Sequence, residues 1–258
     1  MVKPPEGQIT FLFTDIEGST KLSQQFPDKL PAALDKHHSI LIKAIESNNG
    51  FIFQNVGDAF CCAFESSEDA VKAAIEIQLN LANEKWDEAE ITVRIGIHYG
   101  NAEWNGRNYM GYITLARAAR VMSAAYGGQI LVSNDACESV KDNSFTVNER
   151  DFSFCDLGER RLKDVILPIR LYQVIGAGLR EDFPPLMTLD ARPNNLPIQL
   201  TSFIGREKEM KDVKEALKLN RLVTLASAGG SGKTRLALQT AAEVIDEYEN
   251  GVWFVDLA

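Results

Sequence analysis

Two aspartates stand where a chain commonly builds a metal or phosphate site. Asp15 follows the apolar run 8–13, which is typical of a buried strand, and lies in the polar turn TDIEGST. Asp58 lies in NVGD, a sequence typical of a tight hairpin turn. Mg²⁺ prefers carboxylate oxygens, and bound ions can activate a hydroxyl nucleophile and neutralise a triphosphate. Taken singly, Asp15 also fits a helix N-cap and Asp58 an ordinary turn residue.

A glycine-rich segment near the C-terminal end indicates a second phosphate site. SAGGSGKT at 227–234 lies between an apolar run and a helical pattern, which is the context of a Walker A loop. Glycines there leave backbone N–H groups facing a phosphate, while a lysine neutralises charge and a threonine reaches Mg²⁺. The residues in these roles are Gly229, Gly230, Gly232, Lys233 and Thr234. Ser227 stands where the usual pattern has its first glycine.

Strands alternate with long helices over residues 1–176, which favours a sheet with helices packed on it. After the strand at 8–13, we expect a helix at 28–46 and a hairpin of strands at 51–54 and 59–64. Ser66 is expected to cap a second helix. The later elements are expected to be a strand at 91–98, a helix at 114–125 and strands at 129–133, 145–148 and 169–174.

Four prolines without a clear period mark a linker at 177–200, so we divide the chain into a domain at 1–176, that linker and a second unit at 201–258. Helices at 207–219 and 234–247 and strands at 221–226 and 252–255 are expected in the second unit. These 58 residues hold too few strands for a complete ATPase domain, so we expect the first part of a P-loop domain in a longer protein.

Composition excludes several classes of function. The formal net charge is -9 and there is no basic stripe, which argues against nucleic-acid binding by this segment. No run of about 20 apolar residues indicates a membrane span. The four cysteines have no metal-like spacing, and the first residues have no targeting pattern, so we expect a cytoplasmic protein.

Five ordered motifs resemble the class III adenylyl/guanylyl cyclases over residues 7–176. They are FLFTDIEGST, NVGDAF, VRIGIHYG, ARAARVMSAAYGGQILVS and LGERRLKD. The resemblance implies a ferredoxin-like α/β (α+β) domain that works as a homodimer, with active sites in the dimer interface. It also implies conversion of a nucleoside triphosphate, ATP or GTP, to a 3′,5′-cyclic nucleotide and pyrophosphate, with two Mg²⁺ or Mn²⁺ ions in each site.

The resemblance assigns roles to individual residues. Asp15, Asp58 and the backbone of Ile16 match the metal ligands, and Arg120 matches an arginine that stabilises the transition state. The turn after Asp15 would hold the β- and γ-phosphates through backbone N–H groups. The residues expected to bind substrate are Gly18, Ser19, Thr20, Gln54, Asn108 and Lys163. Arg120 and Lys163 also fit plain solvated surface charges.

Three positions depart from the family pattern. Gln54 stands in place of the adenine-selecting lysine, and Asn108 in place of its aspartate or threonine partner. Because both amides carry donor and acceptor atoms, the base is left open. Ala116 replaces the transition-state asparagine, and loss of one such donor costs about 10²- to 10³-fold in rate. The segment 111–120 is also one residue longer than usual.

The upstream and downstream segments NNLPIQLTSFIGRE and GVWFVDLA, together with the P-loop, resemble the start of a STAND-type signalling ATPase module. The leading hypothesis is a nucleotide cyclase controlled by this module. The alternative is a catalytically degenerate cyclase-homology domain that binds nucleotide or dimerises as a regulatory module. A third hypothesis makes the P-loop the only nucleotide site and the first domain a scaffold.

Overall fold

The computed structural model describes residues 3–140, 144–165, 167–191, 194–197, 203, 205–248 and 250–256. The chain forms two compact units. The first comprises Met1–Glu159 and Ile169–Leu186, and the second comprises Arg160–Pro168 and Met187–Ala258. The short segment 160–168, which joins two strands of the first unit, is therefore grouped with the second.

A mixed sheet forms the first unit, with β1 (Gly7–Ile16) in its interior. The strand order is β2-β3-β1-β4-β6-β9-β8-β7, and β5 pairs with β4 outside this path. The other strands are β2 (Phe51–Val56), β3 (Ala59–Phe64), β4 (Val93–Trp104), β5 (Tyr109–Met110), β6 (Ile130–Ser133), β7 (Ser144–Val147), β8 (Arg150–Arg160) and β9 (Ile169–Gly176). β1 is antiparallel to β3 and β4, whereas β6 is parallel to β4. The β-α-β-β-α-β run with order β4-β1-β3-β2 confirms the predicted ferredoxin-like arrangement.

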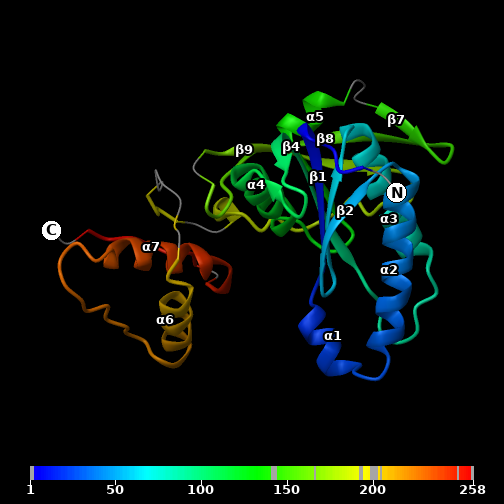
Figure 1. Cartoon of the computed structure of the whole chain (residues 1–258). Coiled ribbons are helices and arrows are strands. Elements are labelled where there is room, and N and C mark those ends of the chain that lie inside the picture. Colours follow the sequence, from blue (N-terminus) through cyan, green and yellow to red (C-terminus); the bar gives the residue numbers. More distant parts are fainter. Residues whose placement is uncertain are drawn as a thin grey trace. The chain divides into compact units, whose positions relative to one another are not determined.

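Two long helices cover one face of this sheet. The helices of the first unit are α1 (Ser19–Gln25), α2 (Leu30–Ser47), α3 (Ser67–Asn83), α4 (Tyr112–Ser123) and α5 (Asn134–Ser139). In Figure 1, α2 and α3 run side by side, and α4 lies on the other side of β1. Ser66 caps α3 as predicted, because its hydroxyl accepts the N–H of Asp69 at 3.4 Å. The main core, which includes Leu12, Leu41 and Phe60, fills the α2–α3 side.

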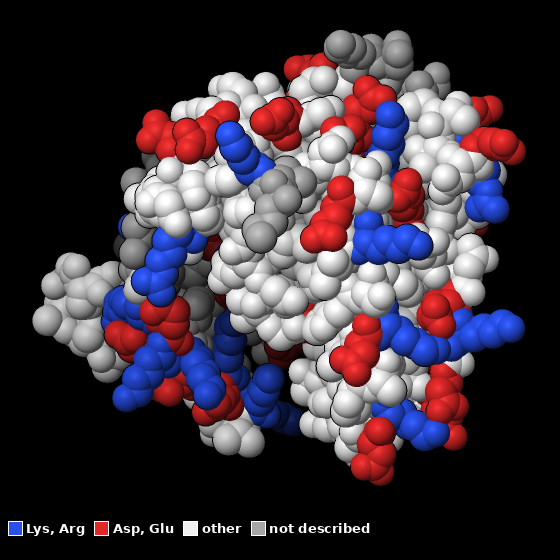
Figure 2. Space-filling model, turned by 45° about the vertical axis from the view of Figure 1, so that its right-hand side comes forward, with Lys and Arg blue, Asp and Glu red and all other residues white. Residues whose placement is uncertain are grey.

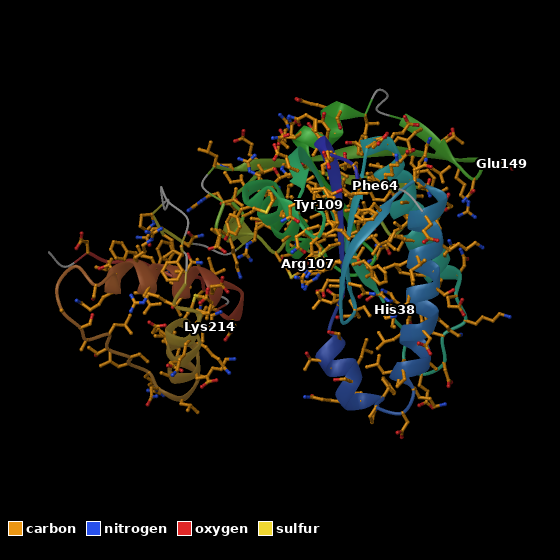
Figure 3. The ribbon with its side chains drawn as sticks, viewed as in Figure 1. His38, Phe64, Arg107, Tyr109, Glu149 and Lys214 are labelled. Atoms are coloured by element: carbon orange, nitrogen blue, oxygen red, sulfur yellow. The ribbon has the colours of Figure 1, made fainter. Side chains whose placement is uncertain are left out.

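Aromatic side chains fill the opposite face, beneath α4. Phe11 meets Phe13, Phe53 and Tyr109 edge-to-face, with ring centroids 5.2–6.2 Å apart. The hydroxyl of Tyr109 donates to the carbonyl oxygen of Pro5 at 2.8 Å, and burial raises the pKa of Tyr109. Figure 3 labels Tyr109 on this side and His38 on α2. Because both faces of β1 are buried, its continuous apolar run is explained.

Most predicted elements of the first unit are present within a few residues of the expected bounds. The missed elements are α5, β5 and β8. Strand β8 alternates apolar and polar residues on a partly exposed surface, so it lacks the apolar run that marked β1. Residues 177–186, which we predicted as linker, are grouped with the first unit. Acidic and basic side chains are interspersed on the visible face (Figure 2), and no helix within the described ranges has the length and apolar character to cross a membrane.

The second unit contains α6 (Glu207–Leu219), α7 (Lys233–Glu243) and the short 3-10 helices η1 (Leu189–Ala191) and η2 (Ile245–Glu247). The strands predicted at 221–226 and 252–255 were wrong, because the described residues form only one isolated bridge there, between Asn194 and Val252. A strand needs a ladder partner to satisfy its backbone. The apolar side chains of these segments instead line a cavity of about 380 Å³ with α6 and α7.

Helix α4 and strand β4 approach each other so closely that only a glycine fits between them. A Cβ atom at Gly96 would overlap the backbone N and Cα atoms of Met122. We therefore expect Gly96→Ala to lower the melting temperature of the first unit by about 3 to 10 °C, measured by circular dichroism. Because the overlap involves backbone atoms, Met122→Ala should not rescue this loss. An unchanged melting temperature in Gly96→Ala would contradict the close approach.

Candidate active site

Asp15 lies at the end of β1 and forms an ion pair with Arg94 at the start of β4. The two residues stand directly opposite in the antiparallel register, and Nε of Arg94 donates to Oδ2 of Asp15 at 2.9 Å, with Nη2 as a second, closer donor. Alternation along β1 puts Asp15 on the same face as Phe13, which is the face beneath α4. Gly18, not Asp15, is the N-cap of α1, so the helix-cap interpretation of Asp15 was wrong.

Asp58 stands in the two-residue turn between β2 and β3, as the hairpin sequence predicts. Gly57 adopts the left-handed conformation that this turn requires, with φ of 65°. Strand β3 is fixed on β1 by the register Thr14 to Phe60, and the backbone N–H of Phe60 also donates to the Thr14 hydroxyl at 3.2 Å. Asp58 lies two residues before Phe60, in the turn, and Asp15 lies one residue after Thr14 on β1. The structure therefore brings the two predicted metal ligands to neighbouring strand ends.

One carboxylate oxygen at this place has no hydrogen-bond partner among the described residues. It is Oδ2 of Asp58, which is buried. A buried acceptor without a partner is costly, and a bound cation would satisfy it. The described residues contain no group of three or more His, Cys, Asp or Glu side chains able to hold a metal. Any ion would thus rely on Asp15, Asp58, the carbonyl of Ile16 and oxygens of a bound phosphate.

The turn after β1 presents part of the predicted phosphate site. Gly18 is left-handed, with φ of 68°, and its carbonyl accepts from Lys21. Ser19 and Thr20 lie in the first turn of α1, where backbone N–H groups have no acceptor within the helix. The N–H of Glu17 instead donates to the carbonyl of Thr92 at 3.0 Å, so it is engaged in the fold. Two of the backbone donors in this turn are therefore suited to phosphate oxygens.

Helix α4 carries Arg120 and Ala116 on one face, because they are four positions apart. Both are partly buried, and α4 packs on β1 and β4, the strands that carry Asp15 and Arg94. Ala116 offers no hydrogen-bond donor from its side chain. The helix begins directly after Gly111 and continues without a break past Arg120.

Gln54 and Asn108 are both exposed. A register shift between Ile52 and Gln54 places Gln54 opposite Cys61, which packs on the aromatic face beneath α4. Asn108 lies in the turn before β5, where Oδ1 of Asn105 accepts its backbone N–H at 2.8 Å. Both side-chain amides are thus accessible to a ligand. Gln54 lies on the same face of the sheet as Asp15.

Lys163 is grouped with the second unit, where its ammonium donates to the carbonyl oxygen of Glu243 at 3.3 Å. Its neighbour Asp164 accepts a hydrogen bond from the Gln239 amide on α7. Lys163 is thus grouped with a different unit from Asp15 and Asp58.

The P-loop residues form an exposed turn before α7. Gly230 and Gly232 are left-handed, with φ of 74° and 79°, and a Cβ at Gly229 would meet open space. The Lys233 ammonium folds back over the loop and donates to the carbonyls of Ser227 and Ala228, each at 2.9 Å. Thr234 follows in the first helical turn and is exposed. Such a loop has the backbone freedom and the positive charge to receive a phosphate.

Sequence reasoning missed Arg94 as a member of the site. The signal was present, because Arg94 is a charged residue at the start of an apolar strand, in the motif VRIGIHYG. Its partner was not readable, since the two residues of the pair are 79 positions apart.

We expect Arg94→Gln to strengthen binding of Mn²⁺ alone, without nucleotide, by about threefold to tenfold, because a competing cation is removed from Asp15. Titration followed by electron paramagnetic resonance measures this. Arg117→Gln is the matched control, since Arg117 pairs loosely with Asp135 at 3.9 Å. Asp58→Asn should weaken Mn²⁺ binding both in the wild-type protein and in the Arg94→Gln variant. Weaker Mn²⁺ binding in Arg94→Gln would contradict competition between Arg94 and the ion, and unchanged binding in Asp58→Asn would contradict the two-aspartate site.

Comparisons with known proteins agree with the fold of the first unit. Residues 1–167 match the adenylate and guanylate cyclase catalytic domain. An uncharacterized protein of Mycobacterium tuberculosis is 31% identical over 210 residues, covering 80% of this chain and 70% of that protein. The adenylate cyclase of Lachancea kluyveri is 32% identical over 167 residues, which cover 54% of this chain and 9% of that enzyme. An adenylate cyclase structure from Trypanosoma brucei, in its monomeric state, superposes with a TM-score of 0.63 at 29% identity, covering 72% of this chain and 96% of that one. The chain therefore belongs to the adenylate and guanylate cyclase catalytic domain family.

Proposed function

We propose that the first unit is a nucleotide cyclase that converts a nucleoside triphosphate, ATP or GTP, to a 3′,5′-cyclic nucleotide and pyrophosphate in signal transduction. The observation that carries the proposal is that Asp15 and Asp58 each lie close to the last paired residues of the neighbouring strands β1 and β3, and that a buried oxygen of Asp58 has no partner among the described residues. The proposed cofactors are two Mg²⁺ or Mn²⁺ ions per site. We place the protein in the cytoplasm, because all four cysteines are free thiols.

Asp15, Asp58 and the Ile16 carbonyl would hold the ions. Bound ions would supply activation of the 3′-hydroxyl and neutralisation of the triphosphate. Arg94 keeps the Asp15 carboxylate oriented through its two donors. Gly18 permits the turn in which the N–H groups of Ser19 and Thr20 would bind phosphate oxygens.

Arg120 is the proposed catalytic residue, placed to stabilise charge that develops on the α-phosphate. Gln54 and Asn108 are proposed to read the base, and their amides suit either purine edge. Lys163 is proposed to bind the triphosphate, as the family resemblance implies. Its ammonium has three donors, of which one is used for the Glu243 carbonyl.

Exposed apolar side chains at the start of α4 support a homodimer, because a second copy would remove them from water. Met110, Tyr112 and Ile113 are 58%, 70% and 68% exposed, at the start of the helix that carries Arg120. Clustered exposed apolar residues commonly mark an interaction surface. Asn108 lies two residues before Met110 and is exposed as well. A second copy covering this surface would cover Asn108.

The alternative of a degenerate regulatory domain rests on Ala116, which removes one transition-state donor. The comparisons do not favour it, since two of the three proteins compared above are adenylate cyclases. Loss of one donor slows catalysis without removing the aspartates or Arg120. We therefore expect slow turnover.

Asp58→Ala should reduce metal-dependent cyclic nucleotide formation at least about 100-fold, because one of two metal carboxylates is lost. The assay uses the whole chain with ATP, GTP, CTP and UTP in Mg²⁺ or Mn²⁺. Asp35→Ala, an exposed aspartate on α2, is the matched control and should retain activity. Full activity in Asp58→Ala would exclude the two-metal proposal, whereas a wild-type protein that binds nucleotide without forming product would establish the regulatory alternative.

We propose further that the second unit belongs to a STAND-type P-loop ATPase module whose nucleotide state controls the cyclase. The left-handed Gly230 and Gly232 and the position of Lys233 favour nucleotide binding there. In an Asp58→Ala background, Lys233→Ala should weaken binding of a fluorescent ADP analogue at least about tenfold, measured by anisotropy. Lys208→Ala on α6 is the control. Equal affinity in all variants would rule out the P-loop site.

A further inference from the structure

Residues 179–186, which we call the strap, cross the turn that joins α4 to β6. They form no helix or strand, and they contain Pro184 and Pro185. They nevertheless belong to the first unit, and Leu186 is buried. A segment without regular structure that is held in place needs specific contacts, and two independent sets of contacts hold the strap.

The first set is aromatic and centres on Tyr126, which follows the end of α4. Its ring stacks on Phe183 at an interplanar angle of 13°, with centroids 6.4 Å apart. Its hydroxyl donates to the carbonyl of Pro185 at 2.8 Å. The guanidinium of Arg180 lies 4.5 Å from the centre of the Phe183 ring. Tyr126 thus contacts the strap through both its ring and its hydroxyl.

The second set is a relay of two buried amides. The backbone N–H of Tyr126 donates to Oε1 of Gln129 at 3.1 Å, and Nε2 of Gln129 donates to Oε1 of Gln173 at 2.7 Å. Nε2 of Gln173 then donates to the carbonyl of Glu181 in the strap at 2.8 Å. Both glutamines are at most 5% exposed, so breaking one link would leave a buried amide without its partner. The relay joins the strap to the backbone of Tyr126.

These contacts act on the end of α4 that carries Arg120. The N–H of Ala124 donates to the carbonyl of Arg120 at 3.2 Å, and Tyr126 follows two residues later. The overlap that a side chain at Gly96 would make with Met122 shows that α4 lies against β4 without a gap. Small shifts of the turn at Tyr126 are therefore transmitted to the last turn of α4.

We propose that the strap positions Arg120, with Tyr126 and Phe183 as positioning residues. This inference rests on the proposed cyclase function, in which Arg120 acts on the transition state. Because residue 187 belongs to the second unit, the strap is also a covalent connection from that unit to the end of α4.

The test uses the whole chain and compares Phe183→Ala, Phe183→Tyr and Tyr126→Phe. We expect Phe183→Ala to lower kcat about tenfold and to change KM less than about twofold, because a misplaced transition-state arginine affects the chemical step more than substrate binding. Phe183→Tyr keeps the stacked ring and should retain kcat. Tyr126→Phe removes only the hydroxyl and should give an intermediate kcat. Tyr248→Phe in the second unit is the matched control.

Amide hydrogen exchange of the same variants gives a readout that does not need turnover. Phe183→Ala should speed exchange in residues 120–126 while exchange in α2 and α3 stays unchanged. If the wild-type protein forms no product, the cyclase proposal fails and this local change alone still supports the strap. Unchanged exchange in 120–126 would overturn the proposal, and so would faster exchange throughout the first unit, since that would indicate general destabilisation.

Discussion

Strand β1 is hydrogen-bonded to β3 on one side and to β4 on the other, and both of its faces are buried. This double pairing fixes the register of the sheet, because a slip of one residue would exchange the two buried faces of β1 and turn Phe11 and Phe13 from α4 toward α2 and α3. The same register sets Asp15 opposite Arg94 and brings the Asp58 turn to the end of β1. The chemistry of the site therefore depends on the packing of one strand.

The negative charge of Asp15 at the end of β1 is stabilised by its ion pair with Arg94. Arg94 supplies two donors to Asp15, while one buried oxygen of Asp58 has no partner among the described residues. An ionised carboxylate is costly to bury unless cations or donors surround it. The site is therefore organised around negative charge that a positively charged ligand would complete, and the guanidinium of Arg94 supplies part of that compensation in the protein itself.

Helix α4 is the other fixed element of the site. The aromatic side chains of β1 and β2 lie beneath it, and the absence of a side chain at Gly96 lets it contact β4 directly. Its N-terminal end exposes apolar side chains, and the strap contacts the turn after its C-terminal end. One rigid helix thus connects a surface suited to a partner, a partly buried arginine and the segment that leads to the second unit.

The sequence by itself determined the elements whose signal is local. The structure confirms four predictions that depend only on neighbouring residues. They are the strand at the apolar run of β1, the hairpin that presents Asp58, the Ser66 cap and the helix at 207–219. Only the tertiary structure decided the contacts between residues far apart in the chain. These are the ion pair of Asp15 with Arg94, the contacts of the strap, and the hydrogen bond of Lys163 to Glu243 in the second unit. The strands predicted at 221–226 and 252–255 were wrong for the same physical reason, because an apolar run becomes a strand only where a partner completes its hydrogen bonds.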